Sequence, residues 1–297
     1  MTSTVAAPRI VAAVDGSTSS LHAALWAAAE AAQRHEPIRL VHAVDSDSLA
    51  YGAWLAPARG YFDLLQSDGQ RILADAKAAI LGQHPDLDVT VALHMSGPVP
   101  ALLKESDGAL LLVIGSRGTG VARAILVGST VVAVAEHARC PVAVIRGHHD
   151  AEAPPTAGPV VVGVDGSPTG DAAVAAAFDE ASWRRADLVA VHAWAEPFSY
   201  TRASNTGWDV SEAESEVLAE RMAGWQEKYP DVTVRRVVER NTPVESLLNN
   251  ALAAQLLVVG SRGHGGFTGM LLGSTSQALI LHATCPVLVV RPVPSTV

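Results

Sequence analysis

The sequence predicts two consecutive α/β domains, each with a five-stranded parallel sheet flanked by helices. The chain has 297 residues, the length of about two domains. Its two halves repeat the same motifs in the same order. Each half also alternates short apolar runs with segments of helical spacing, and strands that alternate with helices form parallel βαβ units. We expect one domain at residues 1–147, a linker at 148–158 and a second domain at 159–297.

The duplication is visible in motifs that recur at a nearly constant offset. The tetrapeptide VDGS begins at Val14 and again at Val164. LLVIGSRG begins at Leu111, and LLVVGSRG begins at Leu256. The two copies of VDGS are 150 residues apart and those of the second motif are 145 apart. The second half therefore lacks five residues between these motifs. A match that runs in order along both halves indicates two copies of one fold.

Each element of the first half has its own signal, taken in chain order. Residues 10–14 form a short apolar strand, 19–34 are Ala-rich with helical spacing, and 38–44 form a second strand. A long helix is expected at 60–81, a third strand at 89–94, and a short helix at 98–106 with a proline in its first turn. A fourth strand at 109–114, a helix at 129–137 and a fifth strand at 142–146 complete the half. The unbroken apolar character of the first and fourth strands predicts burial on both faces of the sheet.

Composition and charge exclude several classes of function. The net charge is −9 and both halves are acidic, so a protein that neutralises nucleic acid is not expected. The two cysteines, Cys140 and Cys285, form neither a disulfide framework nor a zinc cluster, which fits a reducing cytoplasm. The first ten residues lack the apolar stretch of a signal peptide, and no apolar run of about 18 residues predicts a membrane span.

A glycine pattern follows the fourth strand in both halves and predicts a phosphate site. The pattern is G-x2-G-x9-G-[S/T]. Glycines permit a close backbone approach and positive φ, and successive N–H groups then form an anion site. The last Gly-Ser pair begins a helix, whose free N–H groups and dipole favour phosphate. The alternative is a set of turn glycines with a serine N-cap. The residues concerned are Gly115, Gly118, Gly128, Ser129 and Thr130, and Gly260, Gly263, Gly273, Ser274 and Thr275.

With VDGS, the glycine pattern and a Cys-Pro-Val lead into the last strand, the chain resembles the universal stress protein family in its tandem form. The resemblance covers almost all of both halves, and the intact glycine pattern is typical of the ATP-binding branch. It implies two Rossmann-like (adenine nucleotide alpha hydrolase-like) domains, each with one ATP site and Mg²⁺. Asp15 and Asp165 would contact the adenosine, Val41 and Val191 would line the adenine pocket by backbone contacts, and the glycine patterns would hold the phosphates.

Asp15 has a second interpretation that does not depend on the family. A carboxylate at a strand end can accept a hydrogen bond from a ribose hydroxyl or an adenine amine, but Asp-Gly-Ser is also good helix-capping chemistry. Arg117 and Arg262, inside the glycine patterns, could meet phosphate or an acidic partner, or could be solvated loop cations.

Other polar positions carry structural interpretations. We interpret His42 and His192, in the second strands, as buried side chains satisfied by their neighbours, and no pair of residues has the spacing of metal ligands. The two cysteines are expected to be small buried thiols. The irregular segments 45–59 and 195–209 differ most between the halves, so they could cover a ligand, meet a partner or pack as surface loops.

These observations favour an ATP-binding regulator of stress response or growth. No general base is paired with a positioned nucleophile, so no catalytic residue is assigned, although slow ATP hydrolysis stays open. One alternative is a nucleotide hydrolase or nucleotidyl transferase. Another is a scaffold that binds a protein partner or another adenine nucleotide such as cyclic AMP. The apolar fifth strands of the two halves suggest an internal pseudo-dimer, because sheet edges of this kind need covering, and a further homodimer is conceivable.

Overall fold

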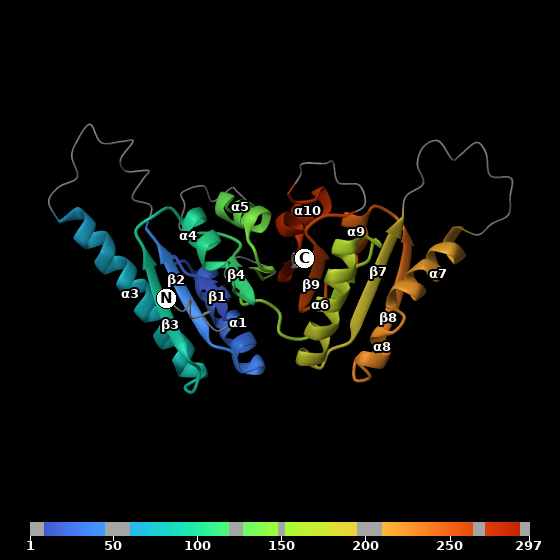
Figure 1. The fold of residues 1–297 in the computed structure, drawn as a ribbon, viewed down its shortest axis with the longest axis horizontal. Helices are drawn as coiled ribbons and strands as arrows, with labels where there is room; N and C mark the ends of the chain where they lie inside the picture. The colour runs from blue at the N-terminus through green and yellow to red at the C-terminus, as the bar shows by residue number, and fades with distance from the viewer. Residues whose placement is uncertain are drawn as a thin grey trace, which may run out of the picture. The chain divides into compact units, whose positions relative to one another are not determined.

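The computed structural model describes residues 9–44, 60–118, 127–147, 152–194, 210–263 and 271–291. The chain divides into two compact units, Met1–Pro154 and Pro155–Val297. Each unit has the expected alternation of strands and helices (Figure 1). The predicted fold class, an α/β fold with a parallel sheet flanked by helices in each of two domains, is therefore confirmed.

All nine elements expected in the first unit are present, with bounds shifted by at most two residues. In chain order they are β1 Ile10–Ala13, α1 Thr18–Arg34, β2 Ile38–Ala43, α3 Tyr61–Gln83, β3 Val89–His94, α4 Pro98–Glu105, β4 Leu111–Gly115, α5 Ser129–His137 and β5 Val142–Ile145.

The strands of the first unit run in the order β3-β2-β1-β4-β5, and every pair is parallel. Residue Ile10 of β1 lies opposite Ile38 of β2 on one side and opposite Leu111 of β4 on the other. The chain thus winds outward from β1 in one direction and from β4 in the other. In such sheets a crevice opens beyond the carboxyl ends of the two central strands, and the glycine pattern follows one of these strands.

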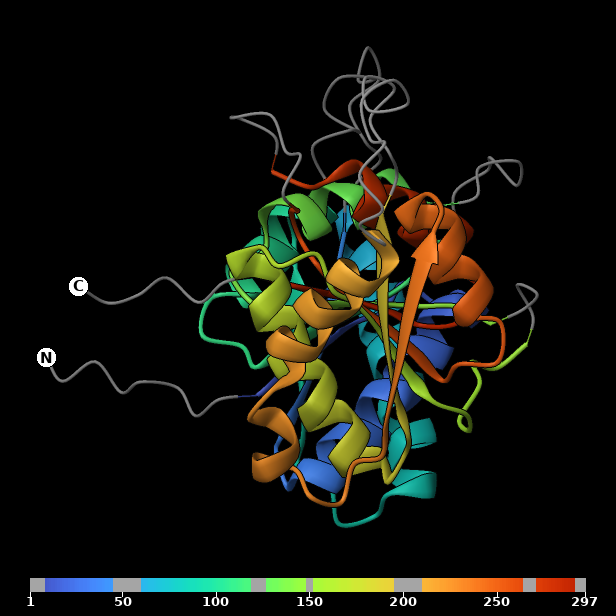
Figure 2. The same cartoon turned by 90° about the vertical axis from the view of Figure 1, so that its right-hand side faces the viewer.

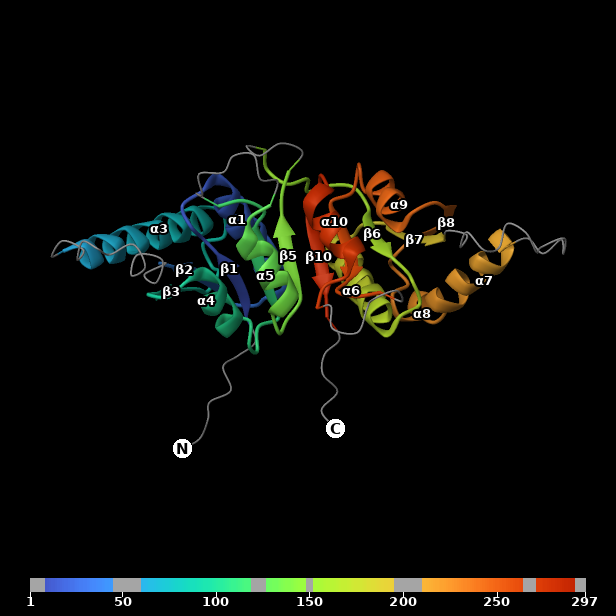
Figure 3. The ribbon, with the colours of Figure 1, turned by 90° about the horizontal axis from the view of Figure 1, so that it is seen from above.

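Helices cover both faces of this sheet. Figure 3 shows α1 and α3 on one face and α4 and α5 on the other. Every residue of β4 is buried, as the predicted burial on both faces requires. Helix α1 turns a face of small residues toward the sheet, which allows close packing of helix on strand. The fully buried alanines of this face are Ala23, Ala24, Ala27, Ala28 and Ala31.

The second unit repeats this plan with the strand order β10-β9-β6-β7-β8. Figure 2, which faces this unit, shows the edge strand β8 between helices of the two layers. A short helix, α8, was not expected, and it places Trp225 and Tyr229 against the buried ring of Phe178. The elements are β6 Val160–Gly163, α6 Pro168–Arg184, β7 Leu188–Trp194, α7 Val210–Met222, α8 Trp225–Lys228, β8 Val234–Arg240, α9 Pro243–Asn250, β9 Leu256–Gly260, α10 Ser274–His282 and β10 Val287–Val290.

Within the described ranges, none of the helices combines the length and apolar character that a membrane crossing needs. Cys140 and Cys285 are buried and form no disulfide, which confirms the interpretation as small buried thiols.

Candidate functional site

The aspartate at the end of the first strand is fixed by the serine that follows it. In the first unit, Asp15 Oδ1 accepts hydrogen bonds from the N–H (3.0 Å) and the hydroxyl (2.6 Å) of Ser17. Ser17 in turn caps α1, because its Oγ accepts the N–H of Ser20 at 3.1 Å. The second unit repeats the arrangement, with Ser167 bonded to Asp165 and capping α6. The helix cap is therefore the serine, and the aspartate holds the cap in place.

The second carboxylate oxygen of each aspartate lies against the glycine pattern. A Cβ placed on Gly118 would lie 2.6 Å from Asp15 Oδ2, and one placed on Gly263 would lie 2.5 Å from Asp165 Oδ2. Such contacts are far inside van der Waals distance. The structure therefore brings together the end of one central strand and the loop after the other, at the point where the strand order reverses, in both units.

Gly115 and Gly260, the first glycines of the two patterns, allow the close approach of a helix. A Cβ on Gly115 would lie 2.7–2.8 Å from the side chain and backbone of Ser19, and one on Gly260 would lie 3.0 Å from the carbonyl oxygen of Thr169. Of the two properties that glycine permits, close approach is the one observed at these described positions. The described glycines with positive φ are Gly16, Gly60, Gly108, Gly158, Gly166 and Gly224, none of which belongs to a pattern.

The third glycine of each pattern begins a helix and leaves its first turn without a side-chain cap. Gly128 and Gly273 are the N-cap residues of α5 and α10, and no side-chain capping bond is formed there among the described residues. The serine N-cap considered as an alternative is thus not observed. Ser129 and Ser274 are instead the first helical residues, and they are exposed, followed by the half-buried Thr130 and Thr275.

Backbone hydrogen bonds close each loop on itself. The N–H of Gly128 donates to the carbonyl of Ser116 at 3.1 Å, and that of Gly273 donates to the carbonyl of Ser261 at 2.8 Å. The start of the helix is therefore tied to the loop that leaves the fourth strand of the unit. The intervening residues 119–126 and 264–270 lie outside the described part of the chain, as do the segments 45–59 and 195–209.

Val41 and Val191 lie one strand away from the aspartates, in the interior of the sheets. Both side chains are buried, and their carbonyl oxygens accept the N–H groups of Val14 and Val164 at 2.9 Å. The backbone contact to adenine that the resemblance implies stays a prediction. The N–H of Arg117 donates to Oγ of Ser19 in α1 at 3.4 Å, and Arg262 is exposed. The phosphate role of both side chains stays a prediction.

Two histidines have a role in the site that the sequence did not indicate. Nδ1 of His42 lies 2.7 Å from the carbonyl oxygen of Val14, and Nδ1 of His192 lies 2.7 Å from that of Val164. A carbonyl can only accept, so Nδ1 carries the proton. Both histidines are hydrogen-bonded to their neighbours as expected, but they are half-buried and not buried. The sequence did not predict that each histidine would bond to the residue that precedes the aspartate, although the tripeptide VHA recurs in both halves.

The two units differ in the helix residue that packs against this histidine. In the first unit Gly69 of α3 makes room for His42, since a Cβ there would lie 2.9 Å from the imidazole Cδ2. In the second unit Glu214 of α7 places Oε2 2.9 Å from Nε2 of His192. A hydrogen bond at that distance requires a second proton on the pair, because Nδ1 of His192 already donates to the sheet.

Comparison with known proteins places this geometry in a family. The model of the "Universal stress protein family" matches residues 7–146 and again 157–291. A universal stress protein of Mycobacterium tuberculosis is 42% identical over 288 residues, which cover 95% of this chain and 96% of the relative. One of Mycolicibacterium smegmatis is 39% identical, with 95% and 97% covered.

The fold recurs in a solved structure as well. A crystal structure of a universal stress protein from Archaeoglobus fulgidus matches with a TM-score of 0.72 and 21% identity, covering 95% of this chain and 98% of that one. The two family matches account for nearly the whole sequence and coincide with the repeated motifs. The chain therefore belongs to the universal stress protein family and contains two copies of its domain.

Proposed function

We propose that each unit binds ATP with Mg²⁺ in the crevice between the first and fourth strands of its own sheet, and that nucleotide occupancy regulates a stress or growth response. One observation carries the proposal. In both units an aspartate at the end of one central strand lies against the glycine loop that follows the other. A carboxylate for the nucleoside and backbone donors for the phosphates thus border the same crevice.

The starts of α5 and α10, at the third glycine of each pattern, support the proposed binding of the phosphates. The N–H groups of a helix first turn need acceptors, and Gly128 and Gly273 supply no side-chain acceptor. The adjoining hydroxyls of Ser129 and Ser274 are exposed and add donors. These residues suit a triphosphate, which offers many acceptor oxygens and a negative charge that the helix dipole favours.

The side chains around the crevice suit binding better than rapid turnover. Asp15 Oδ1 is occupied by two hydrogen bonds from Ser17, so it is a positioning group. No group of three His, Cys, Asp or Glu side chains that could hold a metal ion occurs in the described ranges, so Mg²⁺ would be held largely through the phosphates. Magnesium would supply charge neutralisation there. Slow hydrolysis stays compatible with this proposal. A rate well above about one per minute in a multiple-turnover assay would instead establish that the protein is an enzyme.

A pair of glycine substitutions tests the binding site without disturbing the fold. Among the described residues, the nearest atom to an added Cβ at Gly128 would be Val131 Cγ2, at 4.0 Å, and at Gly273 it would be Arg262 Cα, at 3.5 Å. We expect Gly128→Ala and Gly273→Ala to leave the thermal unfolding temperature nearly unchanged. Each should weaken ATP binding at its own site about tenfold, roughly 1.4 kcal/mol, because the methyl group obstructs the approach of phosphate. Isothermal titration calorimetry with Mg·ATP measures both sites.

The identity of the nucleotide is tested separately. Heating the purified protein releases a tightly bound ligand, and mass spectrometry identifies it. ATP in the supernatant supports the proposal, whereas cyclic AMP would favour a scaffold for another adenine nucleotide. Normal ATP binding by the Gly128→Ala/Gly273→Ala double variant would show that the phosphates do not lie at these helix starts.

A further inference from the structure

A buried serine ties the start of α10 to the end of β9 in the second unit. Ser276, the third residue of α10, is only 4% exposed, and its hydroxyl donates to the carbonyl oxygen of Gly260 at 2.7 Å. Gly260 is the last residue of β9 and the first glycine of the pattern. The matching residue of the first unit is Val131, which is also buried but has no polar group on its side chain. This bond is therefore open to one of the two glycine loops and not to the other.

The glycine loop of the second unit also lies closer to its helix. The backbone bond from the third glycine to the loop is 2.8 Å long in the second unit and 3.1 Å long in the first. A Cβ on Gly273 would lie 3.5 Å from Arg262 Cα and 3.9 Å from the backbone N of Gly263. One on Gly128 would meet Val131 Cγ2 at 4.0 Å and no backbone atom of the described loop within 4 Å. The second loop is thus closed more tightly around the helix start.

The first turns of the two helices use their amides differently. The carbonyl of Gly128 accepts the N–H of Val131, three residues further on, at 3.0 Å, which is a 3₁₀-type bond. The carbonyl of Gly273 accepts the N–H of Gln277, four residues further on, at 3.0 Å, which is an α-type bond. Among the described residues the N–H of Ser276 therefore has no acceptor, whereas that of Val131 has one.

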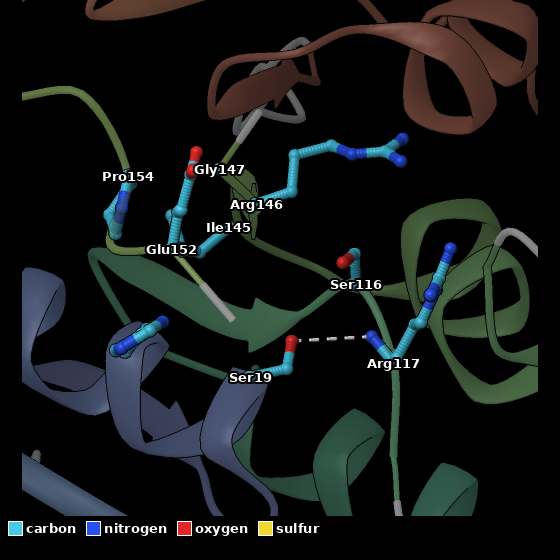
Figure 4. Close-up of a pocket in the computed structure, with 9 residues that line it drawn as sticks. Ser19, Ser116, Arg117, Ile145, Arg146, Gly147, Glu152 and Pro154 are labelled. Atoms are coloured by element: carbon cyan, nitrogen blue, oxygen red, sulfur yellow. Dashed lines mark hydrogen bonds between the residues drawn. The ribbon is translucent and has the colours of Figure 1, made fainter. Parts of the chain in front are cut away.

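The first unit holds its loop from a different helix. The N–H of Arg117 donates to Oγ of Ser19 in α1, the bond drawn as a dashed line in Figure 4. Its length of 3.4 Å exceeds that of an ordinary N–H···O bond. This bond ties the loop to α1, whereas the bond of Ser276 ties the strand from which the loop leaves to α10, the helix proposed to receive the phosphates.

We infer, on the basis of the nucleotide binding proposed above, that Ser276 is a positioning residue that preorganises the second phosphate site and makes it the tighter of the two. Its hydroxyl holds the first turn of α10 in place before the nucleotide arrives, and its N–H is left to donate to a phosphate oxygen. A site that is already ordered loses less conformational entropy on binding. In the first unit, the N–H of Val131 has to leave the carbonyl of Gly128 before it can do the same.

The experiment measures Mg·ATP binding to the full chain by calorimetry, in the Gly128→Ala background, which weakens the first site. Ser276→Ala removes only the hydroxyl and should weaken binding at the second site about fivefold. Ser276→Thr keeps the hydroxyl and should retain most of the affinity. The matched control is Ser246→Ala in α9, since Ser246 is fully buried and its hydroxyl has no partner among the described residues. This control should bind ATP as the parent does.

A second measurement follows the helix start without nucleotide. Ser276→Ala should speed hydrogen exchange at the amide of Gln277, whose bond to Gly273 closes the first turn of α10. Ser246→Ala should leave this rate unchanged. A general loss of stability in the second unit would affect both variants alike, so the comparison isolates the local role of Ser276.

The outcomes separate this role from the nucleotide binding on which it rests. Absence of Mg·ATP binding by the wild type would refute the proposed function itself. If the wild type binds ATP, an unchanged second site in Ser276→Ala, or an equal loss in Ser246→Ala, would overturn the role of Ser276 alone. Tighter binding by the Gly273→Ala variant than by Gly128→Ala would overturn it as well, because the former retains the first site.

Discussion

At the scale of single residues, glycines of the same motif are needed for different reasons. Gly115 is needed by the fold, because an added Cβ would lie 2.8 Å from backbone atoms of Ser19, which cannot move without shifting α1. Gly118 is limited by the side chain of Asp15, whereas at Gly128 the nearest atom of the described residues is Val131 Cγ2, at 4.0 Å. Among the described residues, the packing of the fold therefore does not account for Gly128, and the proposed phosphate does.

Substitution of Gly115 should therefore act on stability. We expect Gly115→Ala to lower the free energy of unfolding by about 1–3 kcal/mol, the usual cost of overpacking. The matched control is Gly82→Ala in α3, where an added Cβ meets nothing within 4 Å and alanine is the better helix former. Chemical denaturation compares the two variants, and equal stabilities would contradict the steric account.

Sequence alone could predict which residues gather at the crevice but not how they do so. The position of Asp15 after one central strand and of the glycines after the other follows from the alternation of strands and helices. Glycine permits both left-handed backbone and close approach, and the sequence does not distinguish which of the two a position uses; the described pattern glycines have no positive φ. The role of Ser17 as the cap, with Asp15 holding it, depends on side-chain rotamers that a motif does not encode.

At the scale of elements, a buried carboxylate joins β1, β2, β3 and α4 of the first unit. Glu105 accepts hydrogen bonds from Arg9 (3.1 Å), from Nη2 of Arg39 (3.4 Å) and from Nε2 of His94 (2.9 Å). Burial on its own raises the pKa of the Glu105 carboxyl, but the hydrogen bonds from His94 and Arg9 and the charge of Arg39 outweigh it. Its pKa is therefore lowered from the ordinary 4.5.

This network should make the first unit sensitive to acid. A carboxyl whose pKa is lower in the folded than in the unfolded state stabilises the fold above about pH 4.5, and this contribution is lost as the pH falls through the folded value. We expect Glu105→Gln to reduce the free energy of unfolding by about 1.5–3 kcal/mol at pH 7. The difference from the wild type should shrink toward pH 3. Unfolding curves measured across this range check it, and a difference independent of pH would refute it.

The second unit offers the control. It joins the corresponding strand and helix by a hydrogen bond whose carboxylate lies on the strand and not on the helix. Asn250 stands where the first unit has Glu105, and its Nδ2 donates to Glu239 Oε1 at 3.0 Å. Glu239 stands where the first unit has His94. Because the donor to Glu239 is the neutral amide of Asn250, Glu239→Gln should lower the free energy of unfolding by less than Glu105→Gln does. The sequence predicted the elements that meet here from their periodicity, but this exchange becomes visible only when the strands are placed side by side.

At the scale of the whole molecule, the two halves share the glycine loops but not their surroundings. Behind the VDGS turn, the first unit packs Ile72 against Gly16, and the second packs the guanidinium of Arg221 against Gly166. We expect the two sites to bind ATP with affinities that differ threefold or more. Calorimetry on Gly128→Ala and Gly273→Ala, one at a time, isolates each intact site. Superimposable curves would show that these differences do not reach the ligand.

The lack of a side-chain cap at the starts of α5 and α10 has a consequence for thermal stability. The N-cap glycines of these helices provide no side-chain acceptor, so the proposed nucleotide would supply acceptors for first-turn N–H groups and stabilise the helix starts. Saturating Mg·ATP should then slow amide hydrogen exchange first at the openings of these two helices and raise the melting temperature with nucleotide concentration. If ATP binds as proposed, the resistance of the protein to unfolding would follow the concentration of nucleotide.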